Sequence, residues 1–298
     1  MTDYSLNRNA DLLLVQTHRS AGYWSGVILN LRRNKVAMFA ACLLLTLLLM
    51  AILAPWIMPA DPYKSSIIHR LKPIGTENYL LGTDELGRDM LSRLILGARL
   101  SLFMGITPVI IAFAIGGTIG VIAGYAGGRI NAVIMRLTDV LYAFPSVLLA
   151  IALSGTLGAG TGNALLSLTV VFIPQIIRVA ESVTTQMRTQ EFVDAARTSG
   201  ASPVRIVFSQ VLNNVLGPIF VFSTSLISVS MILASGLSFL GLGVKPPEPE
   251  WGLMLNTLRT AIYTQPVIAA LPGLMIFITS ISFNVFSDGL RQAMDIKE

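Results

Sequence analysis

The feature that most constrains this chain is a series of long apolar runs without a charged residue. No aspartate, glutamate, lysine or arginine occurs between Arg99 and Arg129, or between Asp139 and Arg178. A helix needs about 20 apolar residues to cross the hydrocarbon core of a bilayer. Charged residues make up only 12% of the chain, whereas a soluble domain carries about 25%. We therefore expect an all-α integral membrane protein.

Six segments are predicted to cross the membrane. The run from Gly155 to Gly162 divides the longer uncharged stretch into two spans, because glycine is a poor helix former and readily forms turns. The other spans are the apolar runs themselves. The predicted spans are residues 36–58, 100–125, the stretch after 139 to about 156, 163–178, 217–243 and 266–287.

The distribution of basic residues predicts the orientation. An even number of spans places both chain ends on one side, and that side holds most of the lysines and arginines. Because basic loops stay inside, both termini are expected in the cytoplasm, with anionic lipid rather than nucleic acid as the partner of these residues. The predicted organisation is a cytoplasmic segment 1–35 with an interfacial helix, a first span 36–58, an extracytoplasmic loop 59–99, a five-helix core 100–290 with a cytoplasmic hairpin 181–213, and a tail 291–298.

Two short helices are expected to lie at membrane surfaces. The first has an apolar stripe and is followed by basic residues, as in helices that lie among lipid headgroups. The second would begin at Thr83 as N-cap and lead into the second span. The apolar stripes are Tyr23, Trp24, Val27, Ile28 and Leu31 in the first helix, and Leu91, Leu94, Ile95 and Ala98 in the second.

A row of glycines marks the second span. Gly116, Gly120, Gly124 and Gly128 recur every four residues and share one face of a helix. Small residues at this spacing let a neighbouring helix approach closely. We expect these glycines to serve helix packing.

The longest inner loop, residues 180–213, predicts a helical hairpin. A polar helix over residues 181–198 is followed by Ser199-Gly200-Ala201, with Gly200 suited to a left-handed turn. Ser202 is a good N-cap and Pro203 a good first residue for a second helix, 204–212. Two interpretations are open on these grounds: a rigid knob that a soluble motor grips, or an ordinary connector lying on the membrane.

The hairpin resembles the EAA loop of binding-protein-dependent ABC importers. The resemblance rests on Asp194-Ala-Ala-Arg-Thr-Ser-Gly200, followed by Val211-Leu212. Asp194 stands where the family usually has glutamate, and Asn213 where it usually has proline, which bears on the rigidity of the second helix's end. In that family the loop docks into a groove on the ATPase subunit. The resemblance assigns ATPase coupling to Phe192, Asp194, Ala195, Ala196, Gly200, Ala201, Ser202 and Pro203.

A second motif narrows the resemblance. Residues 81–93 read LGTDELGRDMLSR and are similar to a signature of the C-type permease in dipeptide, oligopeptide, nickel and glutathione importers. The signature residues are Gly82, Thr83, Asp84, Gly87, Arg88 and Asp89. With further stretches, the resemblance covers about residues 30–295.

The resemblance implies a subunit of a larger assembly. It implies the six-helix permease fold of type I importers in a bacterial inner membrane. The expected partners are a second homologous permease, two cytoplasmic ATPases and an extracytoplasmic binding protein. Short peptides are the favoured substrate, with glutathione and nickel or other metal chelates as alternatives.

Other functional classes are less well supported. No GxxxxGK[ST] motif occurs, so ATP and Mg²⁺ are expected on partner subunits rather than on this chain. No catalytic constellation or metal site is predicted, and His18 and His69 lie in different segments. An enzyme is therefore not expected, and the substrate-binding residues are not readable.

An ion-coupled secondary transporter is the main rival class, and such proteins carry ionisable residues near the bilayer midplane. Here Asp139, Arg178 and Asp288 lie near predicted span ends, and Arg136 is placed to pair with Asp139. Glu250 and Trp251 of the last outer loop are candidates for contact with a binding protein. For the tryptophan, an anchor at the membrane interface is the alternative.

Overall fold

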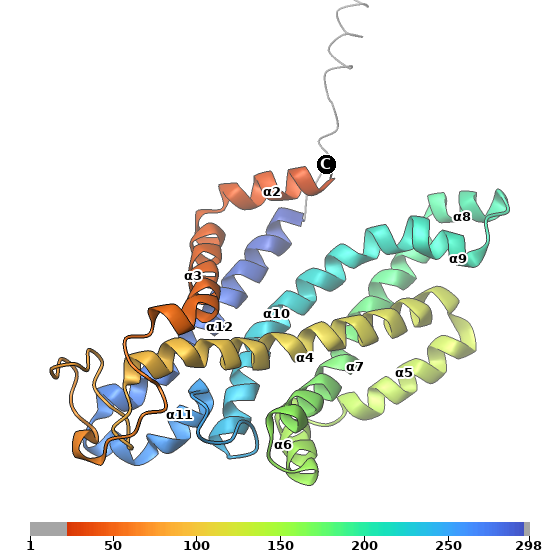
Figure 1. Ribbon diagram of the computed structural model, residues 1–298. Coiled ribbons are helices and arrows are strands. Elements are labelled where there is room, and N and C mark those ends of the chain that lie inside the picture. Colours follow the sequence, from red (N-terminus) through yellow and green to blue (C-terminus); the bar gives the residue numbers. More distant parts are fainter. Residues whose placement is uncertain (1–22, 295–298) are drawn as a thin grey trace, which may run out of the picture.

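The computed structural model describes residues 23–294, which form a bundle of helices (Figure 1). Within this range no β-strand occurs, and two isolated bridges lie in the loop after the first span. The elements are α2 (Tyr23–Arg33), α3 (Lys35–Ile57), η1 (Ile67–His69), α4 (Met90–Ala126), α5 (Gly128–Tyr142), α6 (Ser146–Leu157), α7 (Thr161–Arg188), α8 (Glu191–Thr198), α9 (Pro203–Ile206), the π-turn η2 (Val207–Val211), α10 (Leu212–Phe239), α11 (Trp251–Thr257), η3 (Arg259–Tyr263) and α12 (Pro266–Met294).

The described helices confirm the all-α membrane fold. Five are long and apolar enough to cross a bilayer: α3, α4, α7, α9 with α10 as one run, and α12. The pair α5 and α6 makes a sixth span if it is counted as one, although the pair is bent by 83°. The predicted third span, from after residue 139 to about 156, therefore corresponds to the end of α5 and to α6, with a break between them. Proline at position 145 has no N–H to donate and disfavours helix in the preceding residue, so the helix breaks there.

The predicted surface helix before the second span is not a separate element. Helix α4 begins at Met90 and continues unbroken to Ala126. Its N-cap is Asp89, whose carboxylate accepts a hydrogen bond from the Ser92 N–H at 2.7 Å, and not Thr83. Thr83 is buried in the preceding loop, where its hydroxyl accepts from the Lys72 N–H at 2.8 Å.

Helices α4 and α7 pack closely along the glycine row. A Cβ built at Gly116 would lie 2.8 Å from Ile173 O, and one at Gly120 would lie 2.5 Å from Ala180 Cβ. A Cβ at Gly124 would lie 2.7 Å from Glu181 O. Gly128 departs from the prediction, because no atom lies within 4 Å of a Cβ placed there and the residue begins α5. Only the first three glycines therefore allow the close approach of the two helices.

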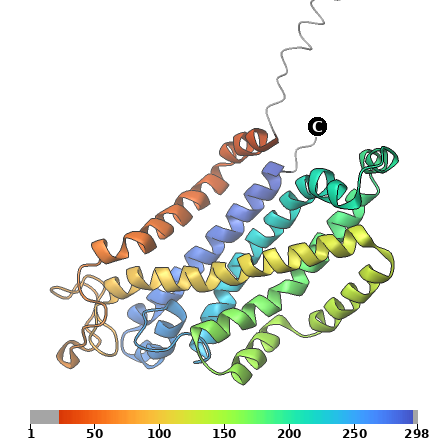
Figure 2. The same cartoon turned by 45° about the vertical axis from the view of Figure 1, so that its right-hand side comes forward.

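The bundle has two distinct ends (Figures 1 and 2). Helix α2, the described end of α12 and the α8–α9 hairpin lie at one end, which we name the hairpin end. The loop between α3 and α4 and helix α11 lie at the other, which we name the cap end. This arrangement separates the two motif-bearing segments by the length of the bundle.

Candidate coupling hairpin, cap and passage groove

The hairpin is built on a glycine turn between α8 and α9. Gly200 has φ +79°, in the left-handed region where glycine is favoured. The Ala201 N–H donates to Ala196 O at 3.1 Å and the Gly200 N–H donates to Arg197 O at 3.0 Å. This pair of bonds is a Schellman motif, which ends α8 sharply. Ser202 then caps α9 by accepting from the Arg205 N–H at 3.4 Å, and Pro203 is the first helical residue.

The helices that flank the turn differ from the prediction. The polar stretch 181–198 is not one helix, because α7 ends at Arg188 and α8 starts at Glu191. The second helix does not stop at residue 212 either. It passes through the π-turn η2 directly into α10, so residues 203–239 form one continuous run. Asn213 lies within this run, where its side-chain amide donates to Ser209 O at 3.2 Å.

The hairpin is fixed to the bundle through buried aliphatic side chains. Val193 of α8 is fully buried and packs in the main core with Ile206 of α9. The Arg197 guanidinium bonds to Asp194 at 2.8 Å, and its Cζ lies 5.9 Å from the ring centre of Tyr125 at the end of α4. These contacts attach the elbow to the end of α4 and to the main core.

The predicted coupling residues lie together on this elbow, and most face away from the bundle. Phe192 is 42% exposed, whereas its neighbour Val193 is inaccessible. Two apolar residues that sequence reasoning did not single out extend the exposed surface: Val204 (67%) and Phe208 (66%). The sequence signal that could have identified them is the presence of apolar side chains in the first turns of the helix that Ser202 caps. The exposed predicted residues are Phe192, Asp194, Ala195, Gly200, Ser202 and Pro203, while Ala196 and Ala201 are half-buried.

Two signature residues at the cap end, Asp84 and Arg88, form a buried ion cluster with Glu85 and Arg93. Asp84 Oδ2 lies 2.6 Å from Arg88 Nε and 3.2 Å from Arg93 Nε, and Arg88 Nη2 lies 2.9 Å from Glu85 Oε1. Asp84 Oδ1 also accepts the backbone N–H groups of Leu86 and Arg88, both at 2.9 Å. Burial, followed by the charge of Asp84, raises the pKa of the Glu85 carboxyl. The signature thus folds the loop and attaches it to the start of α4.

Two glycines of the signature are needed for this fold. Gly82 and Gly87 have φ +74° and +73°. A Cβ at either position would overlap backbone atoms of Lys72 or Ser66, respectively. The signature therefore supports the loop's own structure through its glycines as well as through its charges.

Neither Glu250 nor Trp251 is available to a binding protein, because both are buried. The Glu250 side chain caps α11 by accepting from the Gly252 and Leu253 N–H groups, each at 2.8 Å. The pKa of this carboxyl is raised, because the effect of burial is larger than the opposing effect of the hydrogen bonds to its charged form. Both earlier alternatives for Trp251 are therefore wrong, and the two residues join α11 to α4 and α10.

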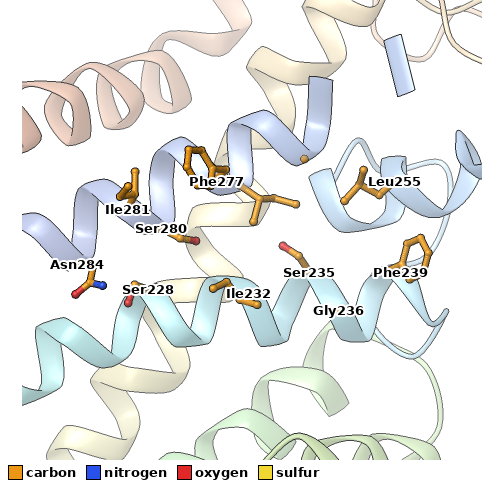
Figure 3. A pocket seen from close by; sticks show the side chains of 12 residues that line it. Ser228, Ile232, Ser235, Gly236, Phe239, Leu255, Phe277, Ser280, Ile281 and Asn284 are labelled. Atoms are coloured by element: carbon orange, nitrogen blue, oxygen red, sulfur yellow. The ribbon is translucent and has the colours of Figure 1, made fainter. Parts of the chain in front are cut away.

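An open groove runs between α10 and α12 (Figure 3). It has a volume of about 570 Å³, and Ser228 and Ser235 of α10 point into it from one side and Ser280 and Asn284 of α12 from the other. Ser280 Oγ is buried and has no hydrogen-bond partner among the described residues. Asn284 also borders a second cavity of about 660 Å³, which α7, α10 and α12 enclose towards the hairpin end. We name these two cavities, which share Asn284 in their linings, the passage groove.

The predicted pair of Arg136 and Asp139 does not form. Asp139 instead makes an ion pair with Arg178 of α7, and both side chains are about half exposed. Helix α7 continues ten residues beyond Arg178, to Arg188, and so extends past the predicted end of the fourth span at about residue 178.

A bundle of five or six apolar spans, with an exposed elbow at one end and a folded cap at the other, is the architecture of a multi-span membrane protein. Residues 116–297 match the family model of the binding-protein-dependent transport system inner membrane component. Residues 22–73 match the N-terminal TM domain of oligopeptide transport permease C. The chain belongs to this family and is a permease subunit of an ABC importer.

Relatives of known name support this assignment. The chain is 40% identical over 265 residues to the glutathione transport system permease protein GsiD of Pectobacterium atrosepticum, covering 89% of this chain and 88% of the relative. It is also 40% identical over 269 residues to the di/tripeptide transport system permease protein DppC of Pseudomonas aeruginosa, covering 89% of each. An inward-facing structure of the MetNI methionine ABC transporter shares the fold, with a TM-score of 0.55 and 18% identity, over 68% of this chain and 97% of that one.

Proposed function

We propose that this chain forms one wall of the membrane passage of an ATP-driven importer of short peptides. It would act with a second homologous permease, two cytoplasmic ATPases that bind ATP and Mg²⁺, and an extracytoplasmic binding protein. The chain itself performs no catalysis. The observation that carries the proposal is the α8–α9 elbow, whose exposed Phe192 lies beside the buried Val193 that fixes it to the core. An apolar anchor on a rigid base is what a docking site for a moving partner requires.

In this proposal the hairpin end faces the cytoplasm and the cap end faces the binding protein. Force applied at α8 would reach α7 through Val193 and α10 through Ile206, because both side chains pack in the main core. The passage groove lies on the same α10, which continues from α9 without a break. Docking of the ATPases and opening of the groove would then be coupled through one helix.

The substrate class rests on the relatives and on the chemistry of the groove. Serine hydroxyls and the amide of Asn284 can donate to and accept from a peptide backbone, while Ile232 and Phe277 offer apolar contacts. A second candidate is glutathione, because the relative named for it is as similar to this chain as the one named for di- and tripeptides. Glutathione is itself a short peptide and suits the same groove.

Reconstitution tests the coupling role. In the complete transporter, Asp194→Lys reverses the charge that the elbow presents and breaks the ion pair with Arg197. We expect weaker co-purification of the ATPases and loss of ATP-driven peptide uptake, with normal membrane insertion. Phe192→Ala should weaken docking similarly, and Gly200→Pro should do so by breaking the turn.

The matched control is Asp194→Glu, which keeps the negative charge and should keep both docking and uptake. Unchanged ATPase association and uptake in all three test variants would contradict the coupling role. Peptide uptake by this chain alone, driven by a proton gradient, would instead support a secondary transporter and overturn the proposal.

A further inference from the structure

The end of helix α4 is completed by side chains from two other helices. The last carbonyl groups of an α-helix find no N–H group of their own helix to accept from. The carbonyl of Tyr125 accepts instead from Arg188 Nη1, at the end of α7, over 3.2 Å. The carbonyl of Ala123 accepts from the Gly127 N–H at 3.0 Å and also from the side-chain amide of Asn131 on α5 at 3.2 Å. Helix α4 therefore ends on groups that α5 and α7 supply.

Glu181 of α7 fixes the position of the Asn131 amide. Its Oε1 accepts from Asn131 Nδ2 at 2.6 Å and from the Thr185 hydroxyl at 3.0 Å. A side-chain amide nitrogen has two N–H groups to donate, and a carboxylate only accepts. The two donors of Asn131 are thus used on Glu181 of α7 and on the Ala123 carbonyl of α4. One amide group therefore joins α4, α5 and α7.

Gly127 leaves the space in which the Arg188 side chain lies. Its φ of +65° is in the region that favours glycine, and a Cβ at this position would overlap the Arg188 guanidinium. Arg197 of α8 approaches the same end of α4, with its Cζ 5.9 Å from the ring centre of Tyr125. Guanidinium groups from α7 and from α8 therefore meet the last turn of α4, where a positive charge also interacts favourably with the helix dipole.

These contacts lie where the elbow joins the bundle. Arg188 is the last residue of α7, and α8 begins at Glu191. A displacement of α8 is therefore transmitted along the chain to this joint first. Further from the joint, the glycine row already holds α4 against α7, and Gly124 of that row lies beside Glu181. The polar contacts extend this packing as far as the joint, so the end of α4 is attached to the base of the elbow.

We propose that Asn131, Glu181 and Arg188 form a clasp through which movement of the elbow reaches α4 and α5. The three are positioning residues for the coupling of ATP hydrolysis to transport. The inference rests on the proposed function, in which partner ATPases dock on the elbow and force enters α7 and α10. The clasp adds the second span to the elements that follow the elbow. None of its residues lies on α8 or α9, so its loss should spare docking and uncouple docking from transport.

Transport measurements on the complete, reconstituted transporter test this role. Arg188→Met removes the donor to the Tyr125 carbonyl, whereas Arg188→Lys keeps a cation that can donate to it. We expect Arg188→Met to retain the ATPases and their ATP hydrolysis. Peptide uptake per ATP hydrolysed should fall about tenfold in this variant, the worth of one hydrogen bond to a charged group. Arg188→Lys should keep most of the uptake.

A second pair of variants breaks the clasp at its other bond. Glu181→Leu removes the acceptor for Asn131, whereas Glu181→Gln keeps a carbonyl oxygen that can accept from the same amide. We expect the loss of uptake only in Glu181→Leu. An unchanged ratio of uptake to hydrolysis in either Arg188→Met or Glu181→Leu overturns the clasp, as does a loss that only follows weaker ATPase association or a lower thermal midpoint. If the wild-type complex binds no ATPase or takes up no peptide, the proposed function fails instead.

A distance measurement tests the clasp without the need for transport. Spin labels are attached to Ile122→Cys on α4 and Gln190→Cys before α8, both exposed positions, in a Cys42→Ser background with cysteine-free partner subunits. Double electron–electron resonance should give a narrow distribution of distances between the two labels, unchanged by ATP, and a broader one when Arg188→Met is added. A separation that changes with ATP while the clasp is intact, or identical distributions with and without Arg188→Met, overturns the clasp, whether or not the proposed function holds.

Discussion

The indole Nε1 of Trp251 donates a hydrogen bond to the backbone carbonyl of Leu94 over 3.0 Å. The Trp251 N–H in turn donates to the Ser101 hydroxyl at 3.0 Å, so two bonds join the start of α11 to α4. Gly97 makes room for this contact, because a Cβ there would lie 2.0 Å from the backbone oxygen of Pro249 and 3.1 Å from the indole ring. The connection between α10 and α12 is therefore fixed to the second span.

Trp251→Phe tests this connection. The change removes the indole donor and leaves a space in a fully buried site. We expect the free energy of unfolding to fall by about 1–3 kcal/mol, from one lost hydrogen bond and a small cavity. Thermal unfolding of the purified transporter in detergent measures the change. An unaltered midpoint would show that the bond does not stabilise the cap end.

The ion cluster of the cap makes a second prediction. Asp84→Asn leaves Arg88 and Arg93 with too little negative charge in a buried site, which typically costs about 3–5 kcal/mol. Glu85→Gln should cost much less, because Glu85 contacts Arg88 alone and is partly exposed. Expression level and thermal midpoint of the two variants provide the comparison. Equal losses would argue against Asp84 as the centre of the cluster.

The raised pKa of Glu85 predicts a dependence of stability on pH. Burial favours the protonated form of this carboxyl and so raises its pKa in the folded chain above the ordinary value of 4.5. The corresponding stability is fully present below that value and is lost as pH rises through the folded pKa. The stability difference between wild type and Glu85→Gln should therefore change across this interval, in favour of the variant as pH rises. Thermal midpoints from pH 4 upwards test it, and parallel profiles would contradict it.

Helix α4 offers a matched pair of glycine substitutions, one in the glycine row and one just outside it. Gly120→Ala places a methyl group 2.5 Å from Ala180 Cβ and 2.6 Å from Ile177 O, so α4 and α7 must separate. Gly117→Ala meets nothing nearer than 4.0 Å and improves helix propensity by up to about 1 kcal/mol. We expect Gly120→Ala to lower the thermal midpoint and Gly117→Ala to leave or raise it. The reverse order would exclude the packing of α4 on α7 as the reason for the row.

Much of the fold follows from local patterns that the sequence displays directly. The first span is predicted at 36–58 and observed as α3, Lys35–Ile57. The two agree because an uninterrupted apolar run of this length can form only one membrane-spanning helix. The elbow follows in the same way from Gly200, Ser202 and Pro203, whose backbone preferences act over a few residues.

What the sequence could not show depends on distant partners. The charges of residues 84–93 indicated a surface helix, but Asp84 neutralises Arg88 and Arg93 within a buried cluster. The predicted fourth span stopped at Arg178, because the sequence does not show that this arginine pairs with Asp139, 39 residues earlier. Glu250 was a candidate contact for a binding protein, because the sequence does not show that its carboxylate accepts hydrogen bonds from two N–H groups of α11.

The unbroken run from Pro203 to Phe239 has a mechanical consequence. Phe208 on the elbow and Ser235 in the passage groove are 27 residues apart, or about 40 Å along one axis. The run is not uniform, because Phe208 lies in the π-turn η2 and Pro218, between the two residues, removes one backbone hydrogen bond from α10. We therefore expect movement of the elbow to reach the groove partly as a bend of the helix at these positions and only partly as a tilt of the whole helix.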